Sequence, residues 1–250
     1  MDLGIAGKRA LVLGASKGLG AASARALLGE GVEVHTISRS GTSPAPGMTA
    51  LAADLSHGDG VKRVIDHVAN VGRFDILVAN SGGPRPGPVQ GVGNDEWQAN
   101  FVAMAVPFFR ISDAVLPGML VGNWGRIITI GSTSVVQPIP GIGISNTVRG
   151  AVAGWSKTLA NEVASYGITV NMVLPGRFDT DRVRELDGLR AKAEGLSTDQ
   201  VKAAVTRDIP VGRYGNANEF GAVVAFVASQ QAAYLTGSML RVDGGGIRSI

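Results

Sequence analysis

The chain of 250 residues contains no cysteine. This absence excludes disulfide bonds, thiolate metal ligands and a cysteine nucleophile, and we predict no metal site. Aromatic side chains are also scarce, at 5% of the residues, and only three of them are tyrosines. A catalytic phenol can therefore come only from Tyr166, Tyr214 or Tyr234.

Charge of either sign is also limited. Charged residues make up 17% of the chain, and the formal net charge is +3. The basic residues are scattered and not interleaved with aromatics, so we expect no nucleic-acid partner. The N-terminus has no basic segment followed by a long apolar core, and the apolar stretch 222–228 is too short to span a bilayer. We therefore expect a cytoplasmic protein with no membrane partner.

Apolar residues and glycine are abundant, at 45% and 36 residues respectively. Short β-branched runs bounded by glycine alternate with longer helical patterns. The predicted strands are 9–13, 32–37, 48–52, 74–79, 126–130, 168–174 and 239–242, and the predicted helices are 18–29, 60–71, 94–116, 145–166, 197–207 and 218–228.

This alternation predicts βαβ units: an α/β fold with one doubly wound parallel sheet and helices on both faces. No linker or internal repeat divides the chain, so we expect one domain over residues 1–250. Right-handed crossovers place the carboxyl ends of all strands on one edge, where ligands bind. Pro107 falls inside the helix predicted for 94–116 and predicts a kink there.

A glycine-rich turn, Gly14-Ala15-Ser16-Lys17-Gly18-Leu19-Gly20, directly follows the first predicted strand. Glycines allow a tight turn and let backbone N–H groups approach a pyrophosphate, which then faces the positive end of the next helix. After the second strand, Ser38-Arg39 stands where an acidic residue would bind the ribose of NAD. Together with Lys17, Arg39 predicts binding of a 2′-phosphate, and hence of NADP(H). The alternative is that both cations are ordinary surface residues.

The motifs along the chain resemble those of the short-chain dehydrogenase/reductase family. The turn resembles the family's TGxxxGxG motif, with Leu13 at the usual Thr position. Further similarities follow in family order: Asp54-Leu55 after the third strand, Asn80-Ser81-Gly82-Gly83 (similar to NNAG), Asn171 with Pro175-Gly176 and Thr180 (similar to NxxxPGxxxT), and Val242-Asp243-Gly244-Gly245 (similar to VDGG). They cover almost the whole chain, and the most similar type is the 3-oxoacyl-acyl-carrier-protein reductase.

The resemblance implies the strand order 3-2-1-4-5-6-7 in a Rossmann-type sheet and a nicotinamide coenzyme. It also implies a homotetramer built on the two long helices. The residues expected to bind NADP(H) are Gly14, Ser16, Lys17, Gly18, Leu19, Gly20, Ser38, Arg39, Asp54, Leu55, Asn80, Ser81, Gly82, Arg149, Pro175, Gly176 and Thr180.

The family works with an Asn–Ser–Tyr–Lys set, and only its serine is retained here, as Ser132. Thirteen positions later Ser145 occupies the Tyr position, and Arg149 occupies the Lys position. Met104 stands where the Asn belongs and is expected to be a core residue. Ser145 and Arg149 lie on one face of a helix, so both are expected to face the coenzyme.

These replacements change the proton chemistry. A phenol with a pKa near ~10 can be tuned toward neutrality by a nearby cation, whereas a serine hydroxyl is a poor acid. Arginine stays protonated, so Arg149 cannot easily relay protons but can hold the ribose and stabilise an alkoxide. Tyr166 lies roughly 30 Å along the helix from Ser145 and does not replace the phenol.

Three mechanisms remain open. In the first, Ser132, Ser145 and Arg149 hold the carbonyl of a small-molecule carbonyl or alcohol substrate, and water supplies the proton; an Arg149 that faces solvent would exclude it. In the second, the substrate carries its own acidic group. In the third, the protein binds NADP(H) with little or no turnover, as a sensor or assembly protein. A lyase or isomerase that uses the same pocket is a weaker possibility.

The segment 177–208 is expected to form a lid over the substrate. It contains equal numbers of basic and acidic residues, so it gives no preference for an anionic substrate. Leu186, Leu189 and Leu196 suit either an apolar pocket or a plain amphipathic helix. Arg85, in the loop after the fourth strand, suits either a substrate carboxylate or an ordinary surface position.

Overall fold

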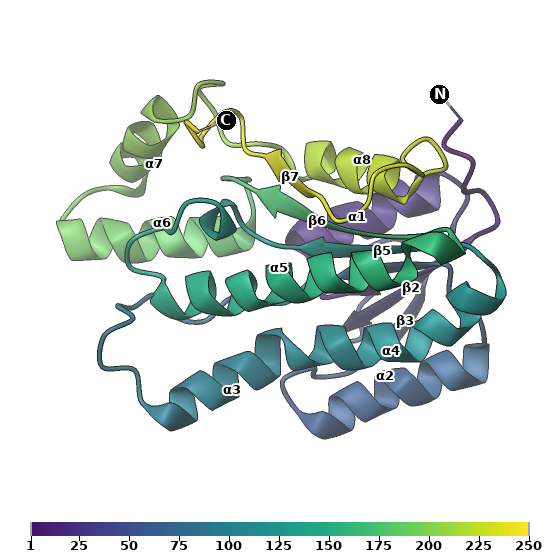
Figure 1. The fold of residues 1–250 in the computed structure, drawn as a ribbon. Coiled ribbons are helices and arrows are strands. Elements are labelled where there is room, and N and C mark those ends of the chain that lie inside the picture. Colours follow the sequence, from purple (N-terminus) through teal and green to yellow (C-terminus); the bar gives the residue numbers. More distant parts are fainter. Residues whose placement is uncertain (1, 250) are drawn as a thin grey trace.

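The computed structural model describes residues 2–249 and contains one seven-stranded sheet. The sheet is parallel throughout, in the order β3-β2-β1-β4-β5-β6-β7, which confirms the predicted fold class and strand order (Figure 1). The strands are β1 (Arg9–Leu13), β2 (Glu33–Ser38), β3 (Thr49–Ala52), β4 (Ile76–Ala79), β5 (Gly125–Ile130), β6 (Ile168–Pro175) and β7 (Met239–Val242).

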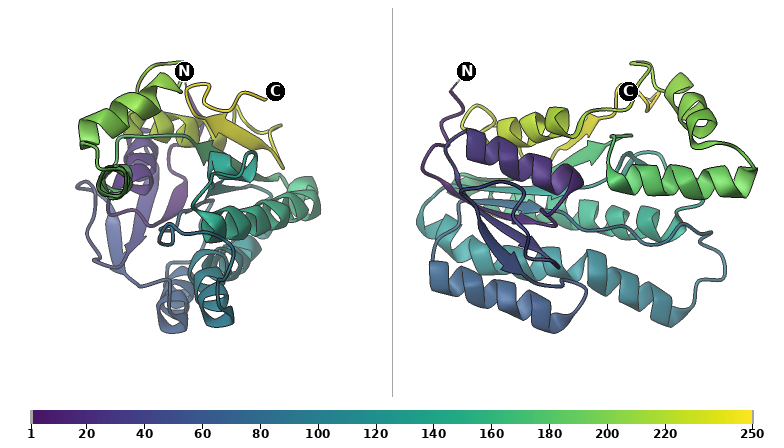
Figure 2. Two further views of the ribbon diagram at one scale, coloured as in Figure 1. Left: turned by 90° about the vertical axis from the view of Figure 1, so that its left-hand side faces the viewer. Right: turned by 180° about the vertical axis from the view of Figure 1, so that it is seen from behind.

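Helices cover both faces of the sheet. Helices α1 and α8 pack together on one face, and α2, α4 and α5 lie on the other (Figures 1 and 2). The helices are α1 (Gly18–Gly29), α2 (Gly58–Val71), α3 (Asn94–Met104), α4 (Val106–Val121), α5 (Gly143–Val163), α6 (Asp181–Glu194), α7 (Thr198–Arg207) and α8 (Ala217–Ala228).

The core consists of two apolar layers separated by the sheet. Leu11 and Ile127 belong to the layer shared with α4 and α5, whereas Val12 and Ile128 belong to the layer shared with α1 and α8. Successive side chains of a strand point to opposite faces, so a strand buried on both faces needs a continuous apolar run. For this reason the sequence pattern located the central strands to within one or two residues.

The helix predicted for 94–116 is broken, as Pro107 predicted. Helix α3 ends at Met104, and α4 begins at Val106 with Pro107 in its first turn. Proline has no N–H to continue the hydrogen-bond ladder. By length and composition, Asn94–Val121 could cross a membrane, but in the fold it is two helices, and Ile111, Val115 and Met119 are buried in the core.

Helices α6 and α7 fill most of the segment 177–208. They stand beyond the carboxyl edge of the sheet, where β6 ends (Figures 1 and 2). The sequence pattern located α7 but did not define α6 as a separate helix. Its polar composition, rich in paired Arg and Glu or Asp, gives little amphipathic signal.

Candidate active site

The glycine-rich turn connects β1 to α1 at the carboxyl edge of the sheet. Gly14 and Gly18 have φ angles of +61° and +60°, which favour glycine. A Cβ on Gly20 would lie 2.3 Å from the Gly14 carbonyl oxygen, so the turn tolerates no side chain there. Asn80 Nδ2 donates to the same carbonyl over 3.1 Å and fixes the turn against the end of β4.

The N-terminus of α1 lacks a capping side chain and has no acidic residue in its first turn. Its first backbone N–H groups therefore keep their hydrogen-bonding capacity for an anion. With the side-chain-free surface of Gly14 and Gly20, this end of the helix fits a dinucleotide pyrophosphate. The other residues predicted for this turn, Ser16 and Leu19, are half-buried within it.

The cations expected to bind the 2′-phosphate lie at neighbouring strand ends. Ala15 N donates to Ile37 O, which holds the turn containing Lys17 beside the end of β2. Lys17 is largely exposed, with its Nζ 3.7 Å from Asp181 Oδ2. Arg39 is exposed and forms no ion pair within residues 2–249. Ser38 is buried, and its Oγ accepts a hydrogen bond from Gly41 N over 3.1 Å.

Asp54 and Leu55 follow β3, the strand beside β2. Asp54 Oδ1 accepts hydrogen bonds from the hydroxyl and backbone N–H of Ser56, and these bonds hold the pKa of Asp54 below its ordinary value. A Cβ on Gly60 would lie only 1.9 Å from the Asp54 carbonyl oxygen, so α2 packs directly on this turn. Leu55 packs against the core.

The predicted residues after β6 bring the lid close to the glycine-rich turn. Gly176 packs against Asp243, since a Cβ there would lie 2.7 Å from Asp243 Cα. Thr180 caps α6, with its Oγ1 accepting from Val183 N over 3.4 Å. Its side chain lies against Gly18, where an added Cβ would meet Thr180 Cγ2 at 3.7 Å. Pro175 ends β6 at the same edge.

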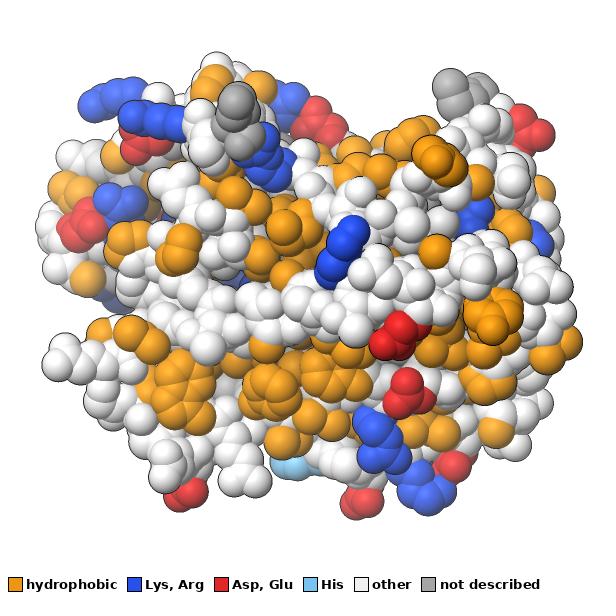
Figure 3. Space-filling view, viewed as in Figure 1, with side chains coloured by type: hydrophobic (Ala, Val, Ile, Leu, Met, Phe, Trp, Pro, Cys, Tyr) orange, Lys and Arg blue, Asp and Glu red, His pale blue; other side chains and the backbone are white. Residues whose placement is uncertain are grey.

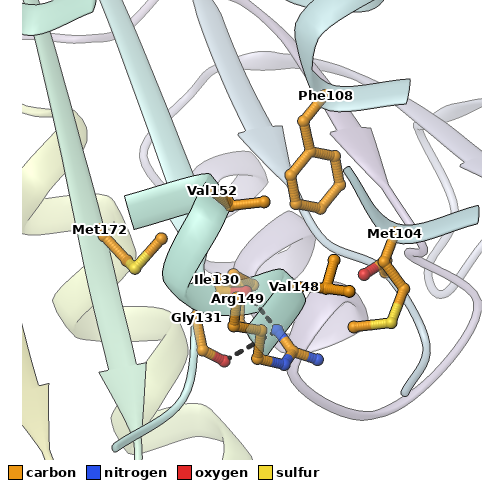
Figure 4. A pocket seen from close by; sticks show the side chains of 9 residues that line it. Met104, Phe108, Ile130, Gly131, Val148, Arg149, Val152 and Met172 are labelled. Atoms are coloured by element: carbon orange, nitrogen blue, oxygen red, sulfur yellow. Dashed lines mark hydrogen bonds between the residues drawn. The ribbon is translucent and has the colours of Figure 1, made fainter. Parts of the chain in front are cut away.

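Ser145 and Arg149 come together one turn apart at the start of α5. Arg149 Nε donates to Ser145 Oγ over 3.2 Å, and Nη1 donates to the carbonyl oxygens of Ile130 and Gly131, each over 3.0 Å (Figure 4). The guanidinium thereby joins α5 to the end of β5. Ser132 lies just beyond this point, and its Oγ accepts from Ser134 N over 3.1 Å.

The Arg149 side chain is half-buried, and its guanidinium turns toward Ser145 and the end of β5. Burial lowers the pKa of Arg149 to about 10, which still leaves it protonated at neutral pH. No carboxylate pairs with it within residues 2–249. A positive charge without a protein counterion is therefore held at the carboxyl edge of the sheet, and the condition that would exclude the first mechanism is not met.

A small cavity lies beside Arg149. Its walls are mostly apolar, and the space open to a water-sized sphere is about 10 Å³. Met104 is 5% exposed and forms part of one wall, which confirms it as a core residue. Besides Arg149, the only side chain with a polar atom along this cavity is Ser81. The apolar walls are formed by Met104, Phe108, Ile130, Val148, Val152 and Met172 (Figure 4).

The three tyrosines do not line this cavity. Tyr166 and Tyr234 are exposed, whereas Tyr214 is buried. The Tyr214 hydroxyl donates to Asp187 Oδ2 over 2.8 Å, and Arg177 Nη1 donates to Asp187 Oδ1 over 2.9 Å. Burial, followed by the Asp187 carboxylate, raises the pKa of Tyr214 to about 12. Tyr214 therefore belongs to the support of α6 and is a poor proton donor.

The sequence did not reveal this buried Asp187 network. The lid segment contains as many acidic as basic residues, and nothing in their spacing distinguishes Asp187 from its exposed neighbours. Arg85, proposed as a possible substrate contact, is exposed, and no side-chain hydrogen bond or ion pair within residues 2–249 involves it. The neighbouring Pro84 instead receives a hydrogen bond at its carbonyl oxygen from Arg182 of α6, over 2.8 Å.

Comparison with known proteins shows that the chain is similar to reductases. Residues 14–246 match a family model described as enoyl-(acyl carrier protein) reductase. The chain is 37% identical to the 3-oxoacyl-[acyl-carrier-protein] reductase of Salmonella typhimurium over 254 residues, which covers 96% of the chain and 97% of the relative. It is also 37% identical to the Pseudomonas aeruginosa enzyme of the same name, over 97% and 98% of the two chains.

Two solved structures share the whole fold. L-sorbose reductase from Gluconobacter frateurii, complexed with NADPH and L-sorbose, superimposes with a TM-score of 0.92 at 29% identity, covering all of both chains. YwfH, an NADPH-dependent reductase involved in bacilysin biosynthesis, gives a TM-score of 0.89 at 26% identity, covering 97% of this chain and 99% of that one.

Proposed function

Because the chain belongs to the short-chain dehydrogenase/reductase family, we propose that it transfers hydride between NADP(H) and a carbonyl or alcohol substrate through an altered proton path. It is an NADP(H)-dependent oxidoreductase of the 3-oxoacyl-acyl-carrier-protein reductase-like type. Its substrate is a small molecule, and a 3-oxoacyl thioester is the first candidate. The inward-facing Arg149, bonded to Ser145 at the edge that carries the glycine-rich turn, is the observation that carries the proposal.

The coenzyme is held by the α1 N-terminus, with Lys17 and Arg39 on its 2′-phosphate. When bound, it supplies or accepts the hydride. The hydroxyls of Ser132 and Ser145 each accept a hydrogen bond from the protein, from Ser134 N and Arg149 Nε respectively. Each hydroxyl therefore keeps its own proton free to donate to the oxygen of a substrate carbonyl.

Arg149 supplies electrostatic stabilisation in this scheme. As negative charge develops on the substrate oxygen, the guanidinium stabilises it through Ser145, and no protein carboxylate competes for the charge. Fixed charges and dipoles of this kind are commonly the largest contribution to catalysis. Since serine and arginine are both poor acids near neutral pH, the proton comes from water or from an acidic group on the substrate.

The alternative, a sensor or assembly protein that binds NADP(H) without turnover, is less well supported. An unused remnant of an active site has no need to hold a half-buried guanidinium against two backbone carbonyls and a serine hydroxyl. Burying such a charge lowers the stability of the fold, and a functional role accounts for its presence. The same contacts carry no specific support for a lyase or an isomerase.

Assembly into a homotetramer is also part of the proposal. Hydrophobic side chains gather on the face formed by α3, α4 and α5 (Figure 3). Phe109 lies between Phe101 and Trp155, with ring centroids 6.3 Å and 4.9 Å away, and Phe101 is partly exposed. An exposed apolar patch of this kind suits an interface between copies of the chain. We also propose a cytoplasmic location.

The segment 177–208 contacts the rest of the fold at the carboxyl edge of the sheet. We propose that 177–208 is the substrate lid within one domain over residues 1–250. Its support is the hydrogen bond from Arg182 of α6 to the loop after β4, together with the contact of Thr180 with Gly18. Both contacts join the lid to segments that follow strands at the carboxyl edge of the sheet, the loop after β4 and the glycine-rich turn after β1.

A turnover assay tests the function. NADPH oxidation is followed by absorbance with a panel of ketones and 3-oxoacyl thioesters, using the native chain and the variant Ser145→Tyr/Arg149→Lys. We expect the native chain to turn over at least one substrate. Coenzyme binding without turnover, combined with activity in the double variant alone, would favour the binding-protein alternative.

A further inference from the structure

Ser81 carries a buried hydroxyl that the fold leaves without a partner. It follows β4 and Asn80, and its Oγ is buried and makes no hydrogen bond within residues 2–249. Buried hydroxyls in folded proteins are almost always hydrogen-bonded, to protein or to water. An unpaired hydroxyl destabilises the fold, so its presence in this position requires an explanation.

Arg149 has unused donors beside the same cavity. The guanidinium has five N–H groups, and Nε and Nη1 use three of them on Ser145, Ile130 and Gly131. Nη2 donates no hydrogen bond within the described part of the chain. Figure 4 shows this second terminal nitrogen pointing away from the two carbonyls, toward the side of Met104.

The cavity shared by Ser81 and Arg149 matches the size of one water. The space open to a water-sized sphere, about 10 Å³, is close to the minimum that a single buried water needs. A buried water also needs two or more polar partners. The hydroxyl of Ser81 and the guanidinium of Arg149 provide them, in a cavity whose other side chains are apolar.

We propose that Ser81 Oγ and the Arg149 guanidinium hold one water between them, and that Ser81 is thereby a positioning residue for Arg149. The water accepts a hydrogen bond from Arg149 and donates one to Ser81 Oγ, so the buried Ser81 hydroxyl gains the partner that it lacks within residues 2–249. It adds to the hydrogen bonds with Ser145, Ile130 and Gly131 that hold the guanidinium in its present rotation. The effect on turnover rests on the function proposed above, whereas the water site and its contribution to stability do not.

The variant Ser81→Ala removes one oxygen atom and tests the site directly. We expect a crystal structure of the native chain at high resolution to contain the water and the variant structure to lack it. We expect kcat to fall at least about tenfold, since a small misplacement of a group that stabilises the transition state has effects of this size. The kcat is measured at saturating NADPH, so that a change in coenzyme affinity at Ser81, itself expected to bind NADP(H), does not enter the comparison.

The pH profile separates positioning from a general loss of structure. The fall of kcat at high pH, where Arg149 loses its proton, is expected to move to lower pH in Ser81→Ala, because the guanidinium loses a partner that favours its charged form. A variant that is merely less stable keeps the native pH profile. That result, or a kcat within twofold of the native value, would overturn the proposal.

Ser112 on α4 provides the matched control. Its Oγ is also buried and unpaired within residues 2–249, but it does not line the cavity. Ser112→Ala removes an unsatisfied hydroxyl, so we expect an equal or higher Tm and unchanged kcat. Ser81→Ala is expected to lower Tm instead. If both variants raise Tm equally and no water is seen, the inference fails. The Tm and the crystal structure test the water site even if the native chain turns over none of the substrates.

Discussion

Arg149 Nε lies 3.2 Å from Ser145 Oγ, one turn earlier in α5. The bond aligns a guanidinium that is positively charged at neutral pH with a hydroxyl that is not itself acidic. The two side chains thus form a fixed electrostatic unit, and the carbonyl groups at the end of β5 set its orientation.

Replacing Arg149 by Met, which has a similar length and no charge, is predicted to lower kcat about 100-fold, as expected when a preorganised donor is removed. NADPH oxidation under substrate saturation measures this. Arg149→Lys is the companion variant. A single ammonium cannot reproduce the planar fork that reaches Ser145, Ile130 and Gly131 together, so we expect an intermediate kcat. Equal activity of all three proteins would contradict the role of Arg149.

Gly20→Ala is predicted to abolish measurable NADPH binding. The added Cβ would lie 2.3 Å from the Gly14 carbonyl oxygen, so the turn must open to accept it. Gly29→Ala in the same helix is the control, because a Cβ there meets nothing within 4 Å. It should raise stability by roughly 0.5–1 kcal/mol and leave the Kd unchanged. Calorimetry and thermal unfolding measure both effects, and normal binding by Gly20→Ala would contradict the placement of the pyrophosphate.

Lys17→Ala and Arg39→Ala are each predicted to raise the Kd for NADPH about tenfold while changing the Kd for NADH little. Only the 2′-phosphate gains charge-assisted hydrogen bonds from these side chains. Asp181→Asn removes the carboxylate 3.7 Å from Lys17 and should tighten NADPH binding. Fluorescence titration with both coenzymes measures these changes. An equal loss of affinity for both coenzymes would assign the two cations to another part of the coenzyme.

The stability of the fold is predicted to fall as the pH drops below about 6.5. Burial, followed by the charge of His35, holds the pKa of His67 below its ordinary value. The unfolded chain therefore binds a proton at His67 more readily, and the stability present above pH 6.5 is lost as the pH falls through the lower pKa of the folded state. Urea unfolding between about pH 5 and pH 8 measures this.

His67→Gln provides the comparison for that pH dependence. Glutamine retains a donor near His35 Nδ1, which lies 2.9 Å from His67 Nε2 in the native chain, but it does not titrate. We expect the variant to show a smaller loss of stability on acidification. Identical pH dependence in both proteins would assign the effect to other groups.

The fold was predictable because its signals are local and repeated. Buried strands such as β6 are continuous apolar runs, and Pro107 marked the break between α3 and α4. The residues at the site could be aligned, but their contacts could not be predicted. Whether Arg149 faces inward depends on the carbonyl groups of Ile130 and Gly131, which come from another strand. The unpaired hydroxyl of Ser81 depends on apolar walls contributed by five separate elements, α3, α4, β5, α5 and β6. Such features arise from packing between distant segments and leave no pattern in the sequence.

The Asp187 network has a consequence for how this scaffold can change. Arg177, the first residue of the lid, and Tyr214, which follows the lid, both donate a hydrogen bond to the Asp187 carboxylate of α6. The two ends of the segment between β6 and α8 are therefore connected to each other through Asp187, close to the sheet. Insertions, deletions or exchanges farther out, in α7 and the end of α6, can reshape what is enclosed without disturbing the strand ends below. Substrate specificity can therefore change among related sequences without a change in coenzyme affinity.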